Sequence, residues 1–243
     1  SATGMNNVDL ETARQKGIEV KNAVGYSSHS VAQHTIASIL QLYNQLSYYD
    51  SYIKSGKYSQ SNIFTHYGPP ITELHNKIFG IIGLGNIGKT VAKIASGFEA
   101  KVKYYSTSGK NIRNEYPQLS LEELLSTSDI ISIHAPLNER TRNLISNEQL
   151  SLMKSTAILV NASRGGIVNE FALAEAIDTD QIGGACIDVF ENEPIKTDNP
   201  LLNVKYREKL VLSPHNAWAS IEARTKLIDI VYQNIEEFIN SKN

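Results

Sequence analysis

Residues 77–95 of the chain read Lys-Ile-Phe-Gly-Ile-Ile-Gly-Leu-Gly-Asn-Ile-Gly-Lys-Thr-Val-Ala-Lys-Ile-Ala. An apolar strand here passes through a G-x-G-x-x-G turn into an amphipathic helix, which is the pattern of a dinucleotide-binding site. Gly83 permits the tight turn, Gly85 lets the backbone approach a pyrophosphate, and Gly88 lets the helix pack closely on its strand. The helix start would face the phosphates with unpaired N–H groups. A lone pattern of this kind also arises by chance, so the assignment to a dinucleotide-binding site depends on the rest of the sequence.

From residue 77 onward, short segments rich in Ile, Val or Leu alternate with helical stretches. We expect strands at 77–82, 101–105, 129–134, 157–161, 182–188 and 209–212. We expect helices at 86–97, 121–127, 147–153, 169–177 and 221–239, with Ser120, Asn147 and Ser220 at helix starts. This alternation predicts an α/β fold with a doubly wound, mostly parallel sheet covered on both faces. Ligands of such sheets bind at the carboxyl ends of the strands.

A long helix is expected at 28–55, before the glycine turn. Ser30 and Gln33 have the spacing of a capping box at its start, and Gly56 is a stop signal at its end. We expect this helix to link two lobes of the molecule. Residues 57–76 lose the helical periodicity and predict a surface loop.

The composition is that of an ordinary globular protein, with 23 basic and 25 acidic residues and a net charge of -2. The absence of a basic stripe argues against nucleic acid as a partner. The absence of an apolar run near the roughly 20 residues that span a bilayer argues against a membrane partner. Cys186 is the one cysteine, which fits a reducing compartment, and we expect a cytoplasmic protein. No metal site is expected, because His29, His34, His66, His75 and His134 lack metal-ligand spacing.

Polar residues gather just beyond the ends of the last three predicted strands, in the segments 161–166, 188–194 and 213–220. There Arg164, Glu193 and His215 could converge on one crevice. Arginine can grip a carboxylate with two parallel hydrogen bonds and polarise a carbonyl. Histidine can give or take a hydroxyl proton near neutral pH, and a neighbouring carboxylate would orient it. Beside a nicotinamide, these groups are the parts needed to reduce a 2-oxo acid.

The sequence resembles the D-isomer-specific 2-hydroxyacid dehydrogenases over essentially its whole length. Four motifs match in order: Gly-Leu-Gly-Asn-Ile-Gly (83–88), Asn-Ala-Ser-Arg-Gly-Gly (161–166), Asp-Val-Phe-Glu-Asn-Glu-Pro (188–194) and Ser-Pro-His (213–215). The resemblance implies that Arg164 binds the substrate, that Glu193 supports the histidine, and that His215 is the acid/base. Glu193 is then preferred to Glu191, which we expect to be solvated.

The same resemblance assigns further binding residues. Ala2-Thr3-Gly4 resembles the loop whose backbone amides hold the substrate carboxylate, and Asp188 resembles the residue that contacts the nicotinamide amide. The residues expected to bind the cofactor are Gly83, Gly85, Asn86, Ile87, Gly88, Ser106, Thr107, Lys110, His134, Ala135, Pro136, Thr141, Ala162, Arg164, Asp188 and His215. The residues expected to bind the substrate are Ala2, Thr3, Gly4, Arg164, His215 and Trp218.

The cofactor phosphate preference stays open between NAD and NADP. The acid expected about 20 residues after the glycine turn, which would bind the ribose 2′-hydroxyl, is absent. Ser106, Thr107 and Lys110 follow the second predicted strand and could bind a 2′-phosphate. The usage of relatives favours NAD.

The resemblance also implies the domain organisation. Residues 1–24 and 220–243 would be a partial, flavodoxin-like substrate domain, and 25–219 the dinucleotide-binding domain. The start at Ser1 looks like the middle of a domain, so we expect a longer natural protein, with any upstream targeting segment open. A homodimer through the long helix is the family expectation. Tyr48, Tyr49 and Tyr52 on that helix fit either a subunit interface or core packing.

The stretch Ala-Trp-Ala-Ser at 217–220 looks most like the glycerate dehydrogenase or hydroxypyruvate reductase branch of the family. We therefore expect hydroxypyruvate or glyoxylate reduction, or the reverse oxidation of D-glycerate. Trp218 could narrow the pocket for a small substrate, although packing explains it equally well. The alternative is a non-catalytic nicotinamide-binding fragment or a corepressor-like sensor of the same fold. A methyltransferase would leave the later motifs unexplained.

Overall fold

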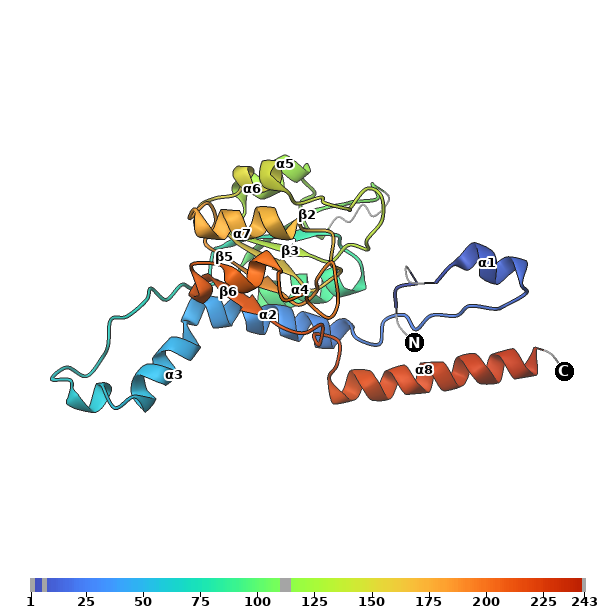
Figure 1. Cartoon of the computed structure of the whole chain (residues 1–243), viewed down its shortest axis with the longest axis horizontal. Helices are drawn as coiled ribbons and strands as arrows, with labels where there is room; N and C mark the ends of the chain where they lie inside the picture. Colours follow the sequence, from blue (N-terminus) through green and yellow to red (C-terminus); the bar gives the residue numbers. More distant parts are fainter. Residues whose placement is uncertain (1–2, 6–7, 110–114, 242–243) are drawn as a thin grey trace.

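The computed structural model describes residues 3–5, 8–109 and 115–241 and centres on a six-stranded sheet (Figure 1). The sheet order is β2-β1-β3-β4-β5-β6, and every neighbouring pair is parallel. The strands are β1 (Ile78–Ile82), β2 (Lys101–Tyr105), β3 (Ile130–Ile133), β4 (Ile158–Asn161), β5 (Gly184–Ile187) and β6 (Leu210–Leu212). All the predicted strands are confirmed, with ends that differ by a residue or two. Because β3, β4 and β5 are buried along their whole length, their apolar runs suit a sheet covered on both faces.

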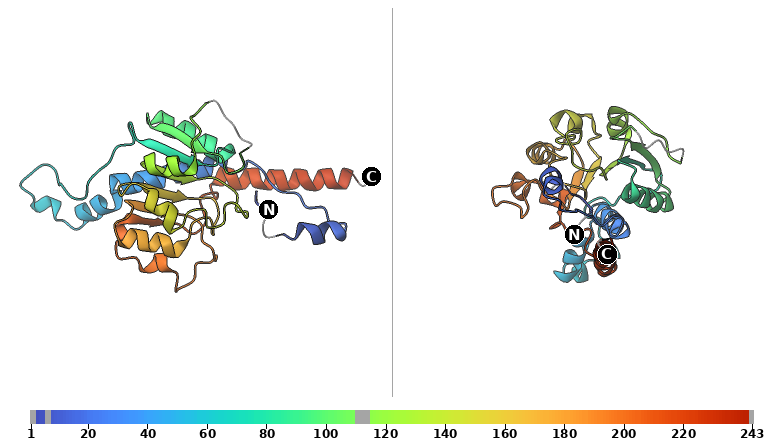
Figure 2. Two further views of the ribbon diagram at one scale, coloured as in Figure 1. Left: turned by 90° about the horizontal axis from the view of Figure 1, so that it is seen from above. Right: turned by 90° about the vertical axis from the view of Figure 1, so that its right-hand side faces the viewer.

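Helices cover both faces of the sheet, which confirms the predicted doubly wound α/β fold (Figures 1 and 2). The helices packed on the sheet are α2 (Ser28–Asn44), α4 (Asn86–Gly97), α5 (Leu121–Thr127), α6 (Asn147–Leu152) and α7 (Glu170–Asp178). On one face, α2 and α4 share a core with β1 that includes Ile39, Phe79 and Val91. On the other face, α5, α6 and α7 share a core that includes Leu124 and Leu150. Short 3-10 helices lie at Tyr58–Gln60, Pro200–Asn203 and Arg207–Lys209.

Side-chain caps begin several of these helices, because their hydroxyl or amide oxygens satisfy N–H groups that the first turn leaves unpaired. Ser120 Oγ accepts the Glu123 N–H at 3.1 Å, as the sequence predicts. Helix α6 begins at Asn147, as predicted. Its N-cap is the preceding residue, Ser146, which forms a capping box with Gln149 three residues on.

The predicted single helix at 28–55 is wrong, because the chain breaks at Gln45 into α2 and α3 (Leu46–Lys54). Gln45 has a left-handed backbone with φ of 50°, and its side-chain amide donates to the Leu42 carbonyl at 2.8 Å. The predicted Ser30 capping box is also wrong. Ser30 lies inside α2, where its hydroxyl donates to the Ala217 carbonyl at 2.6 Å, so the residue serves a distant loop.

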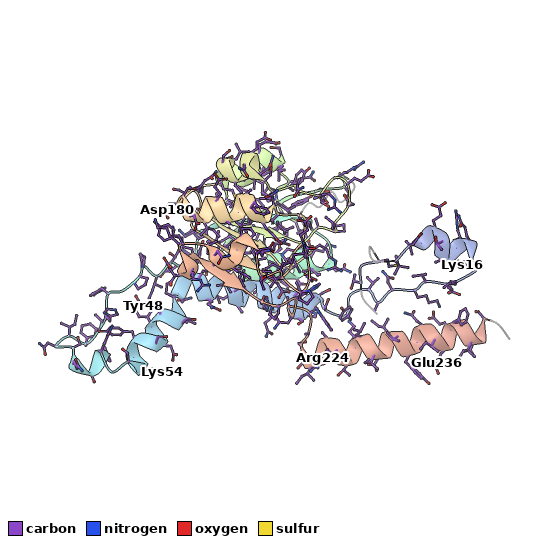
Figure 3. The ribbon with its side chains drawn as sticks, viewed as in Figure 1. Lys16, Tyr48, Lys54, Asp180, Arg224 and Glu236 are labelled. Carbon is purple, nitrogen blue, oxygen red and sulfur yellow. The ribbon has the colours of Figure 1, made fainter. Side chains whose placement is uncertain are left out.

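Two segments extend from the sheet in opposite directions (Figures 1 and 2). One is α3 with the following loop, where Tyr48 and Lys54 are labelled in Figure 3. The other consists of the N-terminal segment and helix α8 (Ile221–Asn240). The N-terminal segment contains a short helix, α1 (Leu10–Gln15), that was not predicted from the sequence. Arg224 and Glu236 mark the course of α8 in Figure 3. Within the described ranges, no helix is long and apolar enough to cross a membrane.

Candidate active site

A cavity of about 490 Å³ lies at the carboxyl ends of β1, β2 and β3, and we call it the glycine-loop cavity. Its lining includes a large part of the predicted cofactor set: Gly83, Gly85, Ser106, Thr107, His134, Ala135 and Pro136. Asn138, Glu139 and Arg140 line it as well. Sequence reasoning missed these residues, although they directly follow the predicted His134-Ala135-Pro136 loop.

Two glycines of the turn, Gly83 and Gly88, have no space for a side chain, whereas Gly85 has open space beside it. Gly83 has φ of +92°, and a Cβ there would lie 2.8 Å from the His134 carbonyl oxygen. A Cβ on Gly88 would lie 2.3 Å from the Gly83 carbonyl oxygen. A Cβ on Gly85 would meet no atom of the described residues within 4 Å. Since Gly85 is also the N-cap of α4, a pyrophosphate group fits against this open helix start.

The end of β2 presents hydroxyl groups to the same cavity. Ser106 and Thr107 line it, and the buried Ser106 Oγ has no hydrogen-bond partner among the described residues. An unpaired buried hydroxyl suits a polar ligand that completes its bonding. Two of the predicted binding residues, Ala2 and Lys110, lie outside the described residues.

A second cavity of about 290 Å³ adjoins the first, and we call it the arginine cavity. His134, Ala135 and Pro136 line both cavities, so the loop after β3 separates them. The arginine cavity is also lined by the predicted residues Thr3, Gly4, Ile87, Ala162, Arg164 and Trp218. Tyr26, Ser27, Val31 and Ser163 complete its lining, and of these only Ser163 lies in one of the four motifs.

Arg164 reaches the arginine cavity from the loop after β4. Asn161 holds this loop by donating from Nδ2 to the Arg164 carbonyl at 2.9 Å. Gly165 is required next to it, because a Cβ there would lie 1.8 Å from the Phe190 carbonyl oxygen. Burial raises the pKa of Tyr26, while the Arg164 guanidinium opposes that shift. The cavity thus holds a neutral phenol near a fixed positive charge.

His215 and Glu193 form a close pair at the carboxyl edge of the sheet, on the loops that follow β6 and β5. The distance from His215 Nδ1 to Glu193 Oε2 is 2.7 Å, and Glu193 Oε1 accepts the Phe190 N–H at 2.9 Å. Each side chain is about one-third exposed, at 35% and 34%. Glu191 is exposed, and it is Glu193 that contacts the imidazole. Among the residues described, Arg164 and Trp218 line the arginine cavity, whereas His215 and Glu193 lie outside its lining.

Asp188 and Thr141 are more buried than their predicted binding roles suggest, whereas His134 is partly buried and lines both cavities. Asp188 is 3% exposed and turns its carboxylate toward the loop that carries His215. Thr141 Oγ1 donates to the Pro136 carbonyl at 2.6 Å and so supports the loop between the cavities. His134 Nε2 lies 2.8 Å from Ser132 Oγ, and burial lowers the pKa of His134 to about 3. His134 is therefore a neutral imidazole near neutral pH.

The described part of the chain contains no group of three or more His, Cys, Asp or Glu side chains arranged to hold a metal ion. Cys186 is free and buried, and burial raises the pKa of its thiol.

Known proteins resemble this chain in sequence and in fold. The sequence profile described as "D-isomer specific 2-hydroxyacid dehydrogenase, NAD binding domain" matches residues 36–217. A hydroxypyruvate reductase of Blautia hydrogenotrophica is 38% identical over 240 residues, covering 98% of this chain and 74% of the relative. A glycerate dehydrogenase of Methylorubrum extorquens is 36% identical, covering 100% of this chain and 75% of the relative. The structure of an acyclic imino acid reductase in complex with NADPH and D-Arg is 33% identical with a TM-score of 0.88, covering 99% and 75%.

Proposed function

The chain belongs to the family of D-isomer-specific 2-hydroxyacid dehydrogenases, and from that premise we propose which residues carry its chemistry. It is an oxidoreductase that transfers a hydride between a nicotinamide cofactor, NAD or NADP, and a 2-hydroxy acid. The proposed substrates are hydroxypyruvate or glyoxylate in the reductive direction and D-glycerate in the oxidative direction. The names of the two relatives and the Ala-Trp-Ala-Ser stretch at 217–220 support this choice.

We propose that the glycine-loop cavity holds the pyrophosphate and adenosine part of the cofactor. Gly85 offers the open helix start, and Ser106 offers an unpaired hydroxyl within the described structure. The nicotinamide end would enter the arginine cavity past the loop at His134, Ala135 and Pro136. When bound, the cofactor supplies or accepts the hydride at the substrate carbon.

Arg164 is proposed to bind the 2-oxo acid through its guanidinium, which can pair with the carboxylate and polarise the carbonyl. His215 is proposed to give a proton to the carbonyl oxygen as the carbonyl carbon gains the hydride, which yields the hydroxyl group. Glu193 accepts the hydrogen on Nδ1 because a carboxylate can only accept, so Nε2 is the nitrogen that remains for the substrate. In the oxidative direction the same Nε2 takes the proton back.

One observation carries this proposal: the 2.7 Å contact between His215 and Glu193, at the same edge of the sheet as the loop that brings Arg164 to the arginine cavity. A carboxylate that orients a histidine is the arrangement of general acid/base catalysis.

The test is His215→Ala, with His75→Ala as the matched control. His75 forms a similar pair with Glu99, at 3.1 Å, but it lies on the exposed surface before β1. NADH oxidation with hydroxypyruvate and with glyoxylate should fall sharply in His215→Ala and stay unchanged in His75→Ala. Undiminished reduction by His215→Ala would show that this assignment is wrong.

The alternative is a protein that binds a nicotinamide cofactor without turnover, as a binding fragment or a corepressor-like sensor. NADH binding by fluorescence titration, measured on the same samples as turnover, separates the two functions. Tight binding of NADH without reduction of hydroxypyruvate or glyoxylate would support the alternative.

We also propose that residues 1–24 and 220–243 belong to a separate substrate domain of flavodoxin-like type. Lys21 Nζ lies 2.9 Å from Glu237 Oε2, so these two ends of the chain are joined away from the sheet. An apolar groove of about 450 Å³ runs between them and is lined by Ile18, Val231 and Phe238 among others.

We propose that the protein acts as a homodimer, with α3 and the loop after it as the contact arm. Tyr52 and His66 stack at 3.7 Å between ring centroids, which fastens the loop to the helix. Exposed apolar side chains cluster on this arm, including Ile63, Phe64 at 90% and Tyr67 at 87% exposure. Light scattering should show a dimer that Phe64→Asp together with Tyr67→Asp converts to a monomer. An unchanged mass in that double variant would exclude the arm as the interface.

The proposed location is the cytoplasm. The unpaired Cys186 supports a reducing compartment, because a chain with one cysteine gains nothing from disulfide formation within itself. Fractionation of cells that express the protein at its natural level tests this location.

A further inference from the structure

The loop from Ser213 to Ala217 is folded around one buried carboxylate, that of Asp188. Asp188 Oδ1 accepts the Asn216 N–H at 3.0 Å and the Ser213 hydroxyl at 2.5 Å. Asp188 Oδ2 accepts the Ala217 N–H at 3.0 Å, and the Asp188 backbone oxygen accepts the His215 N–H at 2.7 Å. Consecutive amides of the loop that carries His215 therefore all end on Asp188.

His215 needs this support because of its own backbone. Its φ is 50°, in the left-handed region that side-chain-bearing residues seldom occupy. Such a conformation persists only where the surroundings hold it, and such positions concentrate at functional sites. If the bonds to Asp188 were lost, relaxation of this backbone would carry the imidazole away from Glu193.

Helix α2 braces the same loop at both of its ends. His34 Nε2 lies 3.0 Å from Ser213 Oγ and 3.8 Å from Asp188 Oδ1. One turn earlier, Ser30 Oγ donates to the Ala217 carbonyl at 2.6 Å. Because residues four apart lie on the same helix face, α2 presents both contacts to the loop together.

We propose that Asp188 is a positioning residue that holds His215 against Glu193, with Ser213 and His34 fixing the Asp188 carboxylate in turn. This inference rests on the proposed acid/base role of His215. It differs from the nicotinamide contact that the family resemblance implies for Asp188. Both Asp188 oxygens already accept backbone N–H groups from the loop, and the side chain is almost fully buried.

The decisive variants are Asp188→Asn and Ser213→Ala in the full chain. Asparagine keeps the size of the side chain but replaces one acceptor oxygen with an NH2 group, which faces a backbone N–H it cannot bind. Ser213→Ala removes one donor to Asp188 and leaves the carboxylate. Asp129→Asn is the matched control, because Asp129 also accepts a backbone N–H, from Ile78 at 2.8 Å, but precedes β3 at the opposite end of the sheet.

The order of the Ser213–Ala217 loop can be measured without cofactor and without turnover. Trp218 is the chain's one tryptophan and follows the loop directly, so its fluorescence reports on this segment. We expect Asp188→Asn to increase acrylamide quenching of Trp218 and amide exchange at residues 215–217, with a smaller increase in Ser213→Ala. Asp129→Asn should leave both measurements unchanged.

Kinetics then separate positioning from cofactor binding. We expect Asp188→Asn to lower kcat for hydroxypyruvate reduction by about 10²-fold at saturating NADH, since misplacement of a reacting group has effects of that size. The dissociation constant for NADH should stay unchanged. The inference would be overturned in favour of a direct cofactor contact if the dissociation constant for NADH rose by about the same factor as kcat fell. In that case quenching of Trp218 and amide exchange at residues 215–217 would stay unchanged.

The result stays interpretable if the proposed function fails. The kinetics of wild type and His215→Ala could show that His215 is not the acid/base. The quenching and amide-exchange measurements would still decide whether Asp188 holds the loop. If Asp188→Asn does not fold, as judged by circular dichroism, Ser213→Ala decides instead. Unchanged exchange and quenching in a folded variant would overturn the inference.

Discussion

Oε2 of Glu193 lies 2.7 Å from Nδ1 of His215, while Oε1 of the same carboxylate accepts the N–H of Phe190. The glutamate is thus fixed to its own loop by one oxygen and orients the imidazole with the other. This arrangement leaves Nε2 as the nitrogen for the proton transfer that we propose, and it places a negative charge next to the imidazolium that would form when His215 is protonated.

We expect Glu193→Gln to lower kcat for hydroxypyruvate reduction by about 10-fold to 10²-fold, within the range of general acid/base effects. The amide oxygen can still accept the Nδ1 hydrogen, but it no longer stabilises the protonated ring. Steady-state kinetics at saturating NADH measure the effect. Glu191→Gln is the matched control and should retain full activity. Equal activities of the two variants would contradict a role for the pair.

The Arg164 guanidinium should be irreplaceable by another cation. Lysine keeps the charge but loses the planar fork that pairs with a carboxylate, so we expect Arg164→Lys to lower kcat/KM for hydroxypyruvate by about 10²-fold. The KM for the 2-oxo acid should rise while the dissociation constant for NADH stays constant. Arg207→Lys, on the exposed 3-10 helix at Arg207–Lys209, serves as the control. A parallel loss of NADH binding would instead place Arg164 on the cofactor.

Substitutions at two glycines of the turn should have different effects, one on cofactor affinity and the other on the stability of the fold. Gly85→Ala adds a methyl group that meets no described protein atom, so it should weaken NADH binding without changing the unfolding free energy. Gly83→Ala should destabilise the fold, because its φ is +92° and the methyl group would lie 2.8 Å from the His134 carbonyl oxygen. Gly97→Ala, at the end of α4 with open space around it, is the control for both measurements. Normal NADH affinity in Gly85→Ala would exclude the turn as the pyrophosphate site.

Local signals made most of the fold predictable. The apolar runs of β3, β4 and β5 are buried along their whole length, and Ser120 and Ser220 cap helices where their spacing indicates. The break at Gln45 was not predictable, since helical periodicity continues across it and a left-handed residue leaves no pattern of its own. Ser30 was misinterpreted because its hydroxyl bonds to Ala217, which lies 187 residues away in the sequence.

In the candidate site too, local features could be predicted from the sequence and contacts between distant residues could not. The glycine turn and the segments after the strands could be found from residue types and from the order of the motifs. The hydrogen bonds of Asp188 could not, because its partners are 25 to 29 residues along the chain and meet it only through the pairing of β5 with β6. Arg140 was missed for a simpler reason, since an arginine in a loop is usually a solvated surface charge.

His134 should make the stability of the fold fall as the pH is lowered below neutral. Burial depresses the pKa of His134 to about 3, whereas an unfolded histidine titrates near 6.5. Between those values the unfolded chain binds a proton that the folded protein excludes, so acid favours unfolding. Linkage for one proton gives a loss of about 1.4 kcal/mol per pH unit once the pH is well below 6.5. Urea unfolding of wild type and His134→Asn between pH 7.5 and pH 5 measures the difference.

Asp129 titrates in a separate window and provides the internal check. Burial pushes the pKa of Asp129 upward, but hydrogen bonds from Lys154 Nζ and the Ile78 N–H outweigh it and hold the pKa below its ordinary value. The stability that Asp129 contributes is complete above the unfolded pKa of about 3.9 and is lost only at lower pH. Above pH 5, the stability of wild type should therefore fall more steeply with acid than that of His134→Asn. Parallel curves for the two proteins would mean that the folded protein protonates His134 as readily as the unfolded chain does.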